Sequence, residues 1–71
     1  MKRTLVSSSN LASIGYDADR RVLEIEFLNR SVYQYFGVPE SLYRGLMKAS
    51  SHGSFFDSYI KRGGFSYQRI I

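Results

Sequence analysis

Residues 22–36 read VLEIEFLNRSVYQYF, and this stretch predicts two neighbouring strands of a β-sheet. In its first six positions apolar and acidic residues alternate, which is typical of a strand with one dry face and one wet face. Glu24 and Glu26 share the wet face, so a solvated surface is a better interpretation of this pair than catalytic carboxylates. Residues 32–36 are rich in strand-forming types. Two strands joined by a short turn form an antiparallel hairpin.

The turn of this hairpin determines which face of the sheet carries Tyr33 and Tyr35, because a shift of one residue moves every side chain to the other face. A two-residue loop at residues 29–30 would place both tyrosines on the open face, where they could stack on unpaired bases. A three-residue loop at residues 29–31 would bury both and expose Gln34. The first alternative buries the Gln34 amide in a dry core, so the sequence favours buried tyrosines.

Further elements are expected on both sides of the hairpin. Residues 11–16 have the period of a strand, and residues 1–6 are either an edge strand or a flexible lead-in. Downstream, Pro39 is suited to the first position of a helix. A second helix starts at about Ser54 and ends at Gly63-Gly64, where two glycines stop it.

The closing segment, residues 65–70, is expected to be a strand that pairs with a free edge, either the first strand or the N-terminal lead-in. The predicted fold class is α+β: an antiparallel sheet in the order β-β-β-α-α-β, with two short helices packed on one face. Because the chain has 71 residues, we expect a single domain over residues 1–71.

The composition restricts the chemistry that this chain can perform. It contains no cysteine and one histidine, so neither a thiolate nor a zinc site of the usual ligands is expected. The lack of cysteine also suits the cytoplasm. The sequence has no apolar run that would predict a membrane span or a signal peptide. We therefore expect a cytoplasmic domain that has no cofactor, no metal and no membrane partner.

His52 is the one imidazole, and it lies beside Gly53 in the break between the two predicted helices. A general base needs an orienting partner and a group to activate, and the sequence supplies neither in a recognisable pattern. A capping or turn residue is the better interpretation of His52. We therefore expect that the protein is not an enzyme, and a small hydrolase built on His52 is the weakest alternative.

The chain is basic, with ten Lys and Arg residues against six Asp and Glu and a net charge of +4. Such a balance favours a polyanionic partner, since nucleic-acid affinity depends largely on phosphate neutralisation. The candidate phosphate contacts are Arg20, Arg21, Arg30, Lys61, Arg62 and Arg69. We expect them at the turns and around the end of the second helix, on one rim of the sheet. With the central tyrosines buried, the candidates for base stacking are Tyr43, Tyr59 and Tyr67.

A series of motifs runs along nearly the whole chain: Ser8-Ser9-Asn10-Leu11, Ile14-Gly15-Tyr16-Asp17, Leu23-Glu24-Ile25-Glu26-Phe27, Val32-Tyr33-Gln34-Tyr35-Phe36, Val38-Pro39 and Gly53-Ser54-Phe55-Phe56. Together they resemble the KTSC domain, a family whose hallmark is a central Tyr-x-Tyr, matched here by Tyr33 and Tyr35. The resemblance extends from about Ser7 to Ile70. One departure is the second hairpin turn, where the family favours glycine and this chain has Arg30 and Ser31.

The resemblance implies a partner class and no catalytic residues. The family is named for a segment at the C-terminus of some lysyl-tRNA synthetases, and it also occurs as a free-standing small bacterial protein. This attachment implies RNA binding. We therefore predict a small non-enzymatic binding module for RNA or another nucleic acid. The alternative is a protein-interaction or homodimerisation domain that uses the open sheet face or an edge strand.

Overall fold

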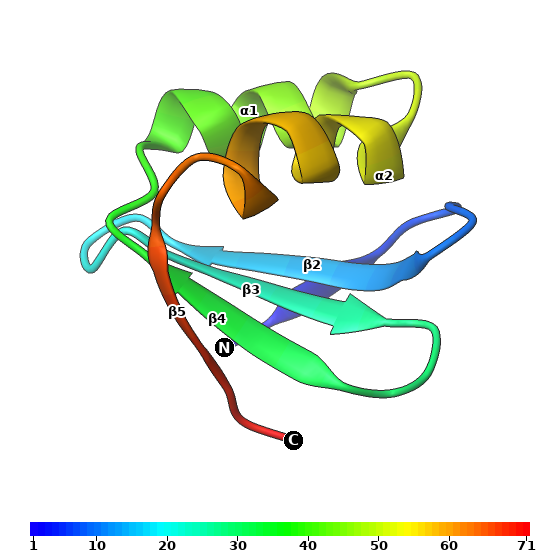
Figure 1. The fold of residues 1–71 in the computed structure, drawn as a ribbon, viewed down its shortest axis with the longest axis horizontal. Helices are drawn as coiled ribbons and strands as arrows, with labels where there is room; N and C mark the ends of the chain where they lie inside the picture. The colour runs from blue at the N-terminus through cyan, green and yellow to red at the C-terminus, as the bar shows by residue number, and fades with distance from the viewer.

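The predicted hairpin lies within a five-stranded antiparallel sheet in the computed structural model, which describes residues 1–71 (Figure 1). The strands are β1 (Arg3–Leu5), β2 (Leu11–Asp17), β3 (Val22–Phe27), β4 (Val32–Phe36) and β5 (Ser66–Arg69). They lie in the sheet in the order β1-β2-β3-β4-β5, and every neighbouring pair is antiparallel. The α+β class is confirmed, with the lead-in forming a strand of its own.

The closing strand β5 pairs with β4, so the predicted pairing with the first strand or the lead-in is wrong. Tyr67 of β5 lies opposite Tyr35 of β4. The other edge of the sheet is already filled by β1, whose Leu5 lies opposite Ser13 of β2. Because β1 covers that edge, the β4 edge is the one left for the chain when it returns from the helices.

The turn between β3 and β4 is neither of the two predicted loops. Its three loop residues are 28–30: the Arg30 N–H donates to the Phe27 carbonyl oxygen at 2.9 Å, and the Phe27 N–H donates to the Ser31 carbonyl oxygen at 2.9 Å. The resulting register places Tyr33 opposite Ile25 on the covered face of the sheet. The face is therefore the one that the sequence favours, although the register differs by two residues.

Two helical segments cover one face of the sheet, and the N-terminus lies on the other side (Figure 1). They are α1 (Glu40–Lys48) and a second segment made of α2 (His52–Phe55) and a π-helical part, η1 (Phe56–Lys61). The second segment begins before the predicted Ser54, because the Ser51 hydroxyl caps it by accepting from the Ser54 N–H at 3.2 Å. Gly64, at φ +79°, follows its end, as the glycine pair predicts. No helix is long and apolar enough to span a membrane.

The core lies between the helices and the sheet. Its members come from all three central strands, the β4–α1 connection and both helical segments: Leu11, Ile14, Leu23, Ile25, Tyr35, Val38, Leu46, Phe56 and Ile60. Leu46 and Ile60, one from each helical segment, are fully buried. This packing fixes η1 above the sheet and so positions the side chains described below.

Glu24 lies on the sheet face away from the helices, as predicted, but the expectation of a solvated carboxylate is wrong. Its exposed fraction is 5%. Arg3 of β1 reaches across the face and forms an ion pair with it at 2.5 Å, and the Gln34 amide donates to its other oxygen at 2.8 Å. Glu26 remains partly exposed and accepts from the Ser13 hydroxyl at 2.8 Å. The lead-in therefore covers part of the face that the alternation marks as wet.

Candidate functional site

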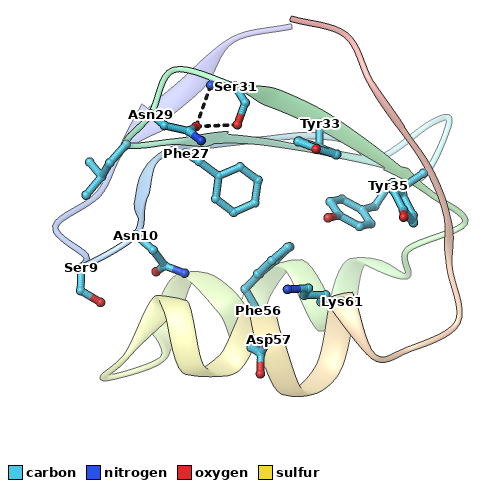
Figure 2. Close-up of a pocket in the computed structure, with 12 residues that line it drawn as sticks. Ser9, Asn10, Phe27, Asn29, Ser31, Tyr33, Tyr35, Phe56, Asp57 and Lys61 are labelled. Atoms are coloured by element: carbon cyan, nitrogen blue, oxygen red, sulfur yellow. Dashed lines mark hydrogen bonds between the residues drawn. The ribbon is translucent and has the colours of Figure 1, made fainter.

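A cavity of about 680 Å³ opens between the helix-covered face of the sheet and η1 (Figure 2). Strand ends, two loops and one helix contribute its lining: Ser9, Asn10, Phe27, Leu28, Asn29, Ser31, Tyr33, Tyr35, Phe56, Asp57, Lys61 and Tyr67. Its volume is that of a typical small-ligand site. Half of these residues are apolar or aromatic, and the rest carry amide, hydroxyl or charged groups.

The aromatic side of the cavity is a connected set of rings. Tyr33 contacts Phe27 edge to face, with ring centroids 5.7 Å apart, and lies 6.1 Å from Tyr67. Tyr35 lies 5.4 Å from Tyr67 and meets Phe56 of η1 edge to face at 5.4 Å. Such offset and edge contacts stabilise each pair beyond simple burial. The family hallmark therefore forms the floor of the cavity.

The three tyrosines of this floor differ in exposure. Tyr35 is buried, with 6% of its surface exposed, Tyr33 is half-buried, and Tyr67 on the edge strand is 62% exposed. Burial raises the pKa of the Tyr35 phenol to about 12, and Tyr33 and Tyr67 add to the shift. The phenol is therefore neutral at physiological pH and adds no negative charge to the cavity. Tyr67 offers the ring surface that a ligand can reach.

The loop side of the cavity carries two asparagines. The Asn29 side-chain oxygen accepts from the Ser31 N–H at 3.0 Å and from the Ser31 hydroxyl at 2.6 Å (Figure 2). Asn10 is brought beside this turn by its own carbonyl oxygen, which accepts from the Leu28 N–H at 3.0 Å. The backbone bond between the two loops places both amides along one side of the cavity.

The helix side of the cavity carries Phe56, Asp57 and Lys61. Lys61 lines the cavity from the end of η1, whereas the Asp57 carboxylate points away from the sheet (Figure 2). Asp57 also lies 3.6 Å from the Arg62 guanidinium. The helix side of the cavity thus carries a cation at its lining, and the neighbouring Asp57 carboxylate lies near Arg62.

The six predicted phosphate contacts do not gather on one rim. Arg20 and Arg21 lie in the β2–β3 turn, where the Arg21 carbonyl oxygen accepts from the Val38 N–H at 3.0 Å. This is the opposite end of the sheet from the turn that holds Arg30. The structure therefore divides the basic residues between two ends of the sheet.

Three of the predicted contacts adjoin the cavity. Lys61 lines it. Arg30 stands between the lining residues Asn29 and Ser31 in the β3–β4 turn, and Arg69 lies opposite Tyr33 in the β5 register. Arg69 also donates through Nε to the Ile71 carbonyl oxygen at 2.8 Å.

Of the tyrosines predicted to stack on bases, only Tyr67 lines the cavity. Tyr43 is stacked on Tyr16, with centroids 4.7 Å apart and ring planes 9° from parallel. Tyr59 is exposed and leans on Phe55 at 4.6 Å, away from the cavity lining. The ring of Tyr67 is therefore the candidate contact, and Tyr59 provides a matched exposed tyrosine outside the site.

His52 is the first residue of α2, directly after the break between the two helical segments, where the sequence predicts a capping or turn residue. Its Nδ1 lies 2.8 Å from the Leu46 carbonyl oxygen near the end of α1. Since a carbonyl oxygen can only accept, Nδ1 carries the proton in this contact. The imidazole therefore joins the two helical segments and lies outside the cavity lining.

The sequence did not indicate Asn10 or Asn29 as site residues. Both are typical turn residues, and each forms the local hydrogen bond that such residues form in turns. Their joint position at the cavity follows from the pairing of β2 with β3, which brings Leu11 opposite Phe27. No local pattern distinguishes them from turn residues elsewhere.

Comparison with known proteins identifies the relatives of this chain. The model of the KTSC domain family matches residues 7–65. An uncharacterised protein of Stutzerimonas stutzeri is 39% identical over 70 residues, which cover 99% of each chain. A lysine–tRNA ligase of Nostoc punctiforme is 37% identical over 62 residues, or 87% of this chain and 11% of the ligase. The crystal structure of a KTSC domain protein from Yersinia pestis superposes with a TM-score of 0.92 at 48% identity, covering 99% of this chain and 97% of that one.

Proposed function

This chain belongs to the KTSC domain family, and from that premise we propose that it is a non-enzymatic, cytoplasmic module that binds single-stranded RNA or another unpaired nucleic acid. The aromatic cavity is the observation that carries the proposal. An unpaired base stacks on the reachable ring of Tyr67, and the Lys61 ammonium contacts a neighbouring phosphate. Stacking on an aromatic side chain contributes about 1–3 kcal/mol per base and tolerates any base.

The charge around the cavity supports this proposal. Lys61 lines the cavity, Arg30 and Arg69 adjoin it, and the Asp57 carboxylate is paired with Arg62. A single strand that enters the cavity therefore meets cations at several points along its backbone. Neutralisation of phosphates by such cations supplies most of the non-specific affinity for nucleic acid.

The relatives add support from their context. One matched protein is named lysine–tRNA ligase, and this chain corresponds to about a tenth of its length. A segment attached to an enzyme that acts on tRNA has a ready use for RNA affinity. The His52 contact with the Leu46 carbonyl oxygen supports a capping role and leaves the binding function as the better proposal than hydrolysis.

The test is a fluorescence anisotropy titration of the whole chain against labelled single-stranded RNA about eight nucleotides long, within the usual site size of small domains. We expect binding that weakens between about 50 and 200 mM salt, with a logarithmic slope of about −0.7 per phosphate contact. The Tyr67→Ala variant loses one stacking contact, so its Kd should rise by about 5- to 150-fold.

Tyr59→Ala is the matched control, because Tyr59 is a similarly exposed tyrosine that does not line the cavity. Its Kd should equal that of the unmodified chain. Absence of binding at low salt, or affinity that salt does not change, would contradict the proposal. Equal loss in both tyrosine variants would place the contact elsewhere.

The sheet edges favour a second candidate function, the binding of a protein partner or of a second copy. Strands β1 and β5 each leave one edge unpaired, and Leu5 is 82% exposed and Ile71 69% exposed beside them. An open edge is a template for another strand. Light scattering tests the homodimer: a dimer that Leu5→Lys dissociates supports it, and a strict monomer at all concentrations rules it out.

A further inference from the structure

The orientation of the Asn29 amide is fixed by its neighbour. The Ser31 N–H can only donate, so the atom that faces it at 3.0 Å is the Asn29 oxygen. The Ser31 hydroxyl donates to the same oxygen at 2.6 Å. The Asn29 NH₂ group is consequently turned away from the turn and lies on the cavity side (Figure 2). It presents hydrogen-bond donors to any ligand in the cavity.

Asn10 presents the same kind of group. Its side-chain oxygen accepts from the Ser8 hydroxyl at 3.1 Å, and the same oxygen lies against Gly53, where a Cβ would collide with it. The nitrogen end of the amide points toward the cavity (Figure 2). Both asparagines therefore have an engaged oxygen and a free NH₂ group.

The opposite side of the cavity adds a third donor. Lys61 lines the cavity on the helix side, and its ammonium group can only donate hydrogen bonds. The Asp57 carboxylate points away and lies near Arg62. At the end of the cavity that holds Asn10 and Asn29, both amides thus present donors, and a ligand edge that complements them carries acceptor oxygens.

We propose that the cavity selects keto bases, whose ring carbonyl oxygens accept from the Asn29 and Asn10 NH₂ groups while the ring lies against Phe27 at the same end of the cavity, with a neighbouring base of the strand on Tyr67. This inference rests on the proposed function and names the ligand class within it. Uracil and cytosine have the same size and differ at ring position 4, where uracil has a carbonyl oxygen and cytosine an amino group. The amino group of cytosine would face the NH₂ donor of an asparagine, and both groups would be left without a hydrogen-bond acceptor.

The first test measures the affinities of oligouridine and oligocytidine of equal length under equal salt. Oligocytidine loses one hydrogen bond and brings two donors face to face. We therefore expect oligouridine to bind about tenfold more tightly than oligocytidine. Oligothymidine is the DNA arm, since thymine carries the same carbonyl groups. Equal binding of oligouridine and oligothymidine assigns the selection to the base, whereas a preference for oligouridine adds a contact to the 2′-hydroxyl.

The second test uses Asn29→Asp. The aspartate keeps an oxygen for the Ser31 N–H and hydroxyl, so the turn is preserved, but it replaces the NH₂ donor by an acceptor. The ratio of oligouridine to oligocytidine affinity should fall by about tenfold. Gln68→Glu is the matched control, because Gln68 lies opposite Gln34 on the other face of the sheet. It adds the same charge and should leave the ratio unchanged.

The outcomes separate this inference from the proposed function. Equal affinity for the two pyrimidines, with the salt dependence and the Tyr67→Ala loss retained, overturns the base selection and leaves nucleic-acid binding in place. An unchanged ratio in Asn29→Asp also overturns it. Where Asn29→Asp does not fold, Asn10→Asp takes its place, since it keeps the oxygen that Ser8 contacts. Failure of every oligonucleotide to bind overturns both proposals.

Discussion

At the scale of single residues, the Tyr-x-Tyr pair joins the packed core to the lining of the cavity. Tyr35 is held by Phe56 and belongs to the buried core, while Tyr33 is half-buried and lies between Phe27 and Tyr67. The inner end of the array is therefore rigid, and the outer end is open. Such preorganisation lowers the entropy that a ligand loses when it stacks.

Arg30 adopts a backbone conformation that favours glycine, with φ +72° in the three-residue β3–β4 loop. A side chain in this region costs about 1–2 kcal/mol, because Cβ approaches the following carbonyl oxygen. Arg30→Gly should therefore raise the free energy of unfolding by about 1 kcal/mol, after the greater entropy loss of glycine. Urea denaturation followed by circular dichroism measures this change.

Arg20→Gly is the control for this substitution, since it removes the same side chain at a turn position where φ is not positive. It should lower the free energy of unfolding by about 0.5–1 kcal/mol through the greater freedom of the unfolded chain. A loss of stability in Arg30→Gly equal to that in Arg20→Gly would contradict the account of the loop.

The glycine that the family favours in this turn thus has a physical reason that only the structure supplies, the positive φ of Arg30. The sequence favours burial of the tyrosines because a buried Gln34 amide is costly, and that preference is confirmed. The position of the loop could not be predicted, since it depends on the side-chain bonds between Asn29 and Ser31. These bonds make residues 28–30 the loop, with Ser31 facing Phe27.

At the scale of elements, the π-helical segment η1 determines what faces the sheet. In an α-helix, residues five apart lie on different faces, because the repeat is 3.6 residues. The i→i+5 bonds of a π-helix bring residues five apart above one another. Phe56 and Lys61 are such a pair, and both line the cavity. The wider turn therefore places a cation beside the aromatic floor.

This placement predicts different roles for two neighbouring cations. Lys61→Gln should weaken RNA binding about fivefold and reduce the salt slope by about 0.7, the value of one single-strand phosphate contact. Arg62→Gln should change the RNA affinity and the salt slope by less than half of these amounts, because Arg62 lies near Asp57 outside the cavity lining. Anisotropy titrations at several salt concentrations measure both variants, and equal effects would contradict the role assigned to η1.

The helices themselves were predictable, but the π-helical part was not. The apolar residues Phe55, Phe56, Tyr59 and Ile60 predict one buried helical face; the structure buries Phe56 and Ile60 but leaves Tyr59 exposed. The spacing of four residues between Phe56 and Ile60 fits an α-helix equally well, so the sequence contains no signal for the wider turn. The helix could therefore be predicted from the sequence, whereas the place of Lys61 in the cavity lining could not.

At the scale of the whole molecule, the charge is distributed over two ends of the sheet. Arg20 and Arg21 lie at the end opposite Arg30, although all three were predicted to share one rim. The net charge of +4 is therefore spread over two regions, one with the aromatic cavity and one without it. The rings at the other end, Tyr16 and Tyr43, are stacked on each other, so the proposed base contact is assigned to the cavity.

The central claim is that nucleic acid binds at the cavity, and nuclear magnetic resonance of the amide groups tests it most directly. On titration with oligouridine at low salt, the account predicts shifts confined to residues around the cavity, led by Asn29, Tyr33 and Tyr67. The same titration of Tyr67→Ala should show smaller shifts at equal concentration. Shifts confined to the turn at Arg20 and Arg21, or to the face that carries Glu24, would contradict the claim.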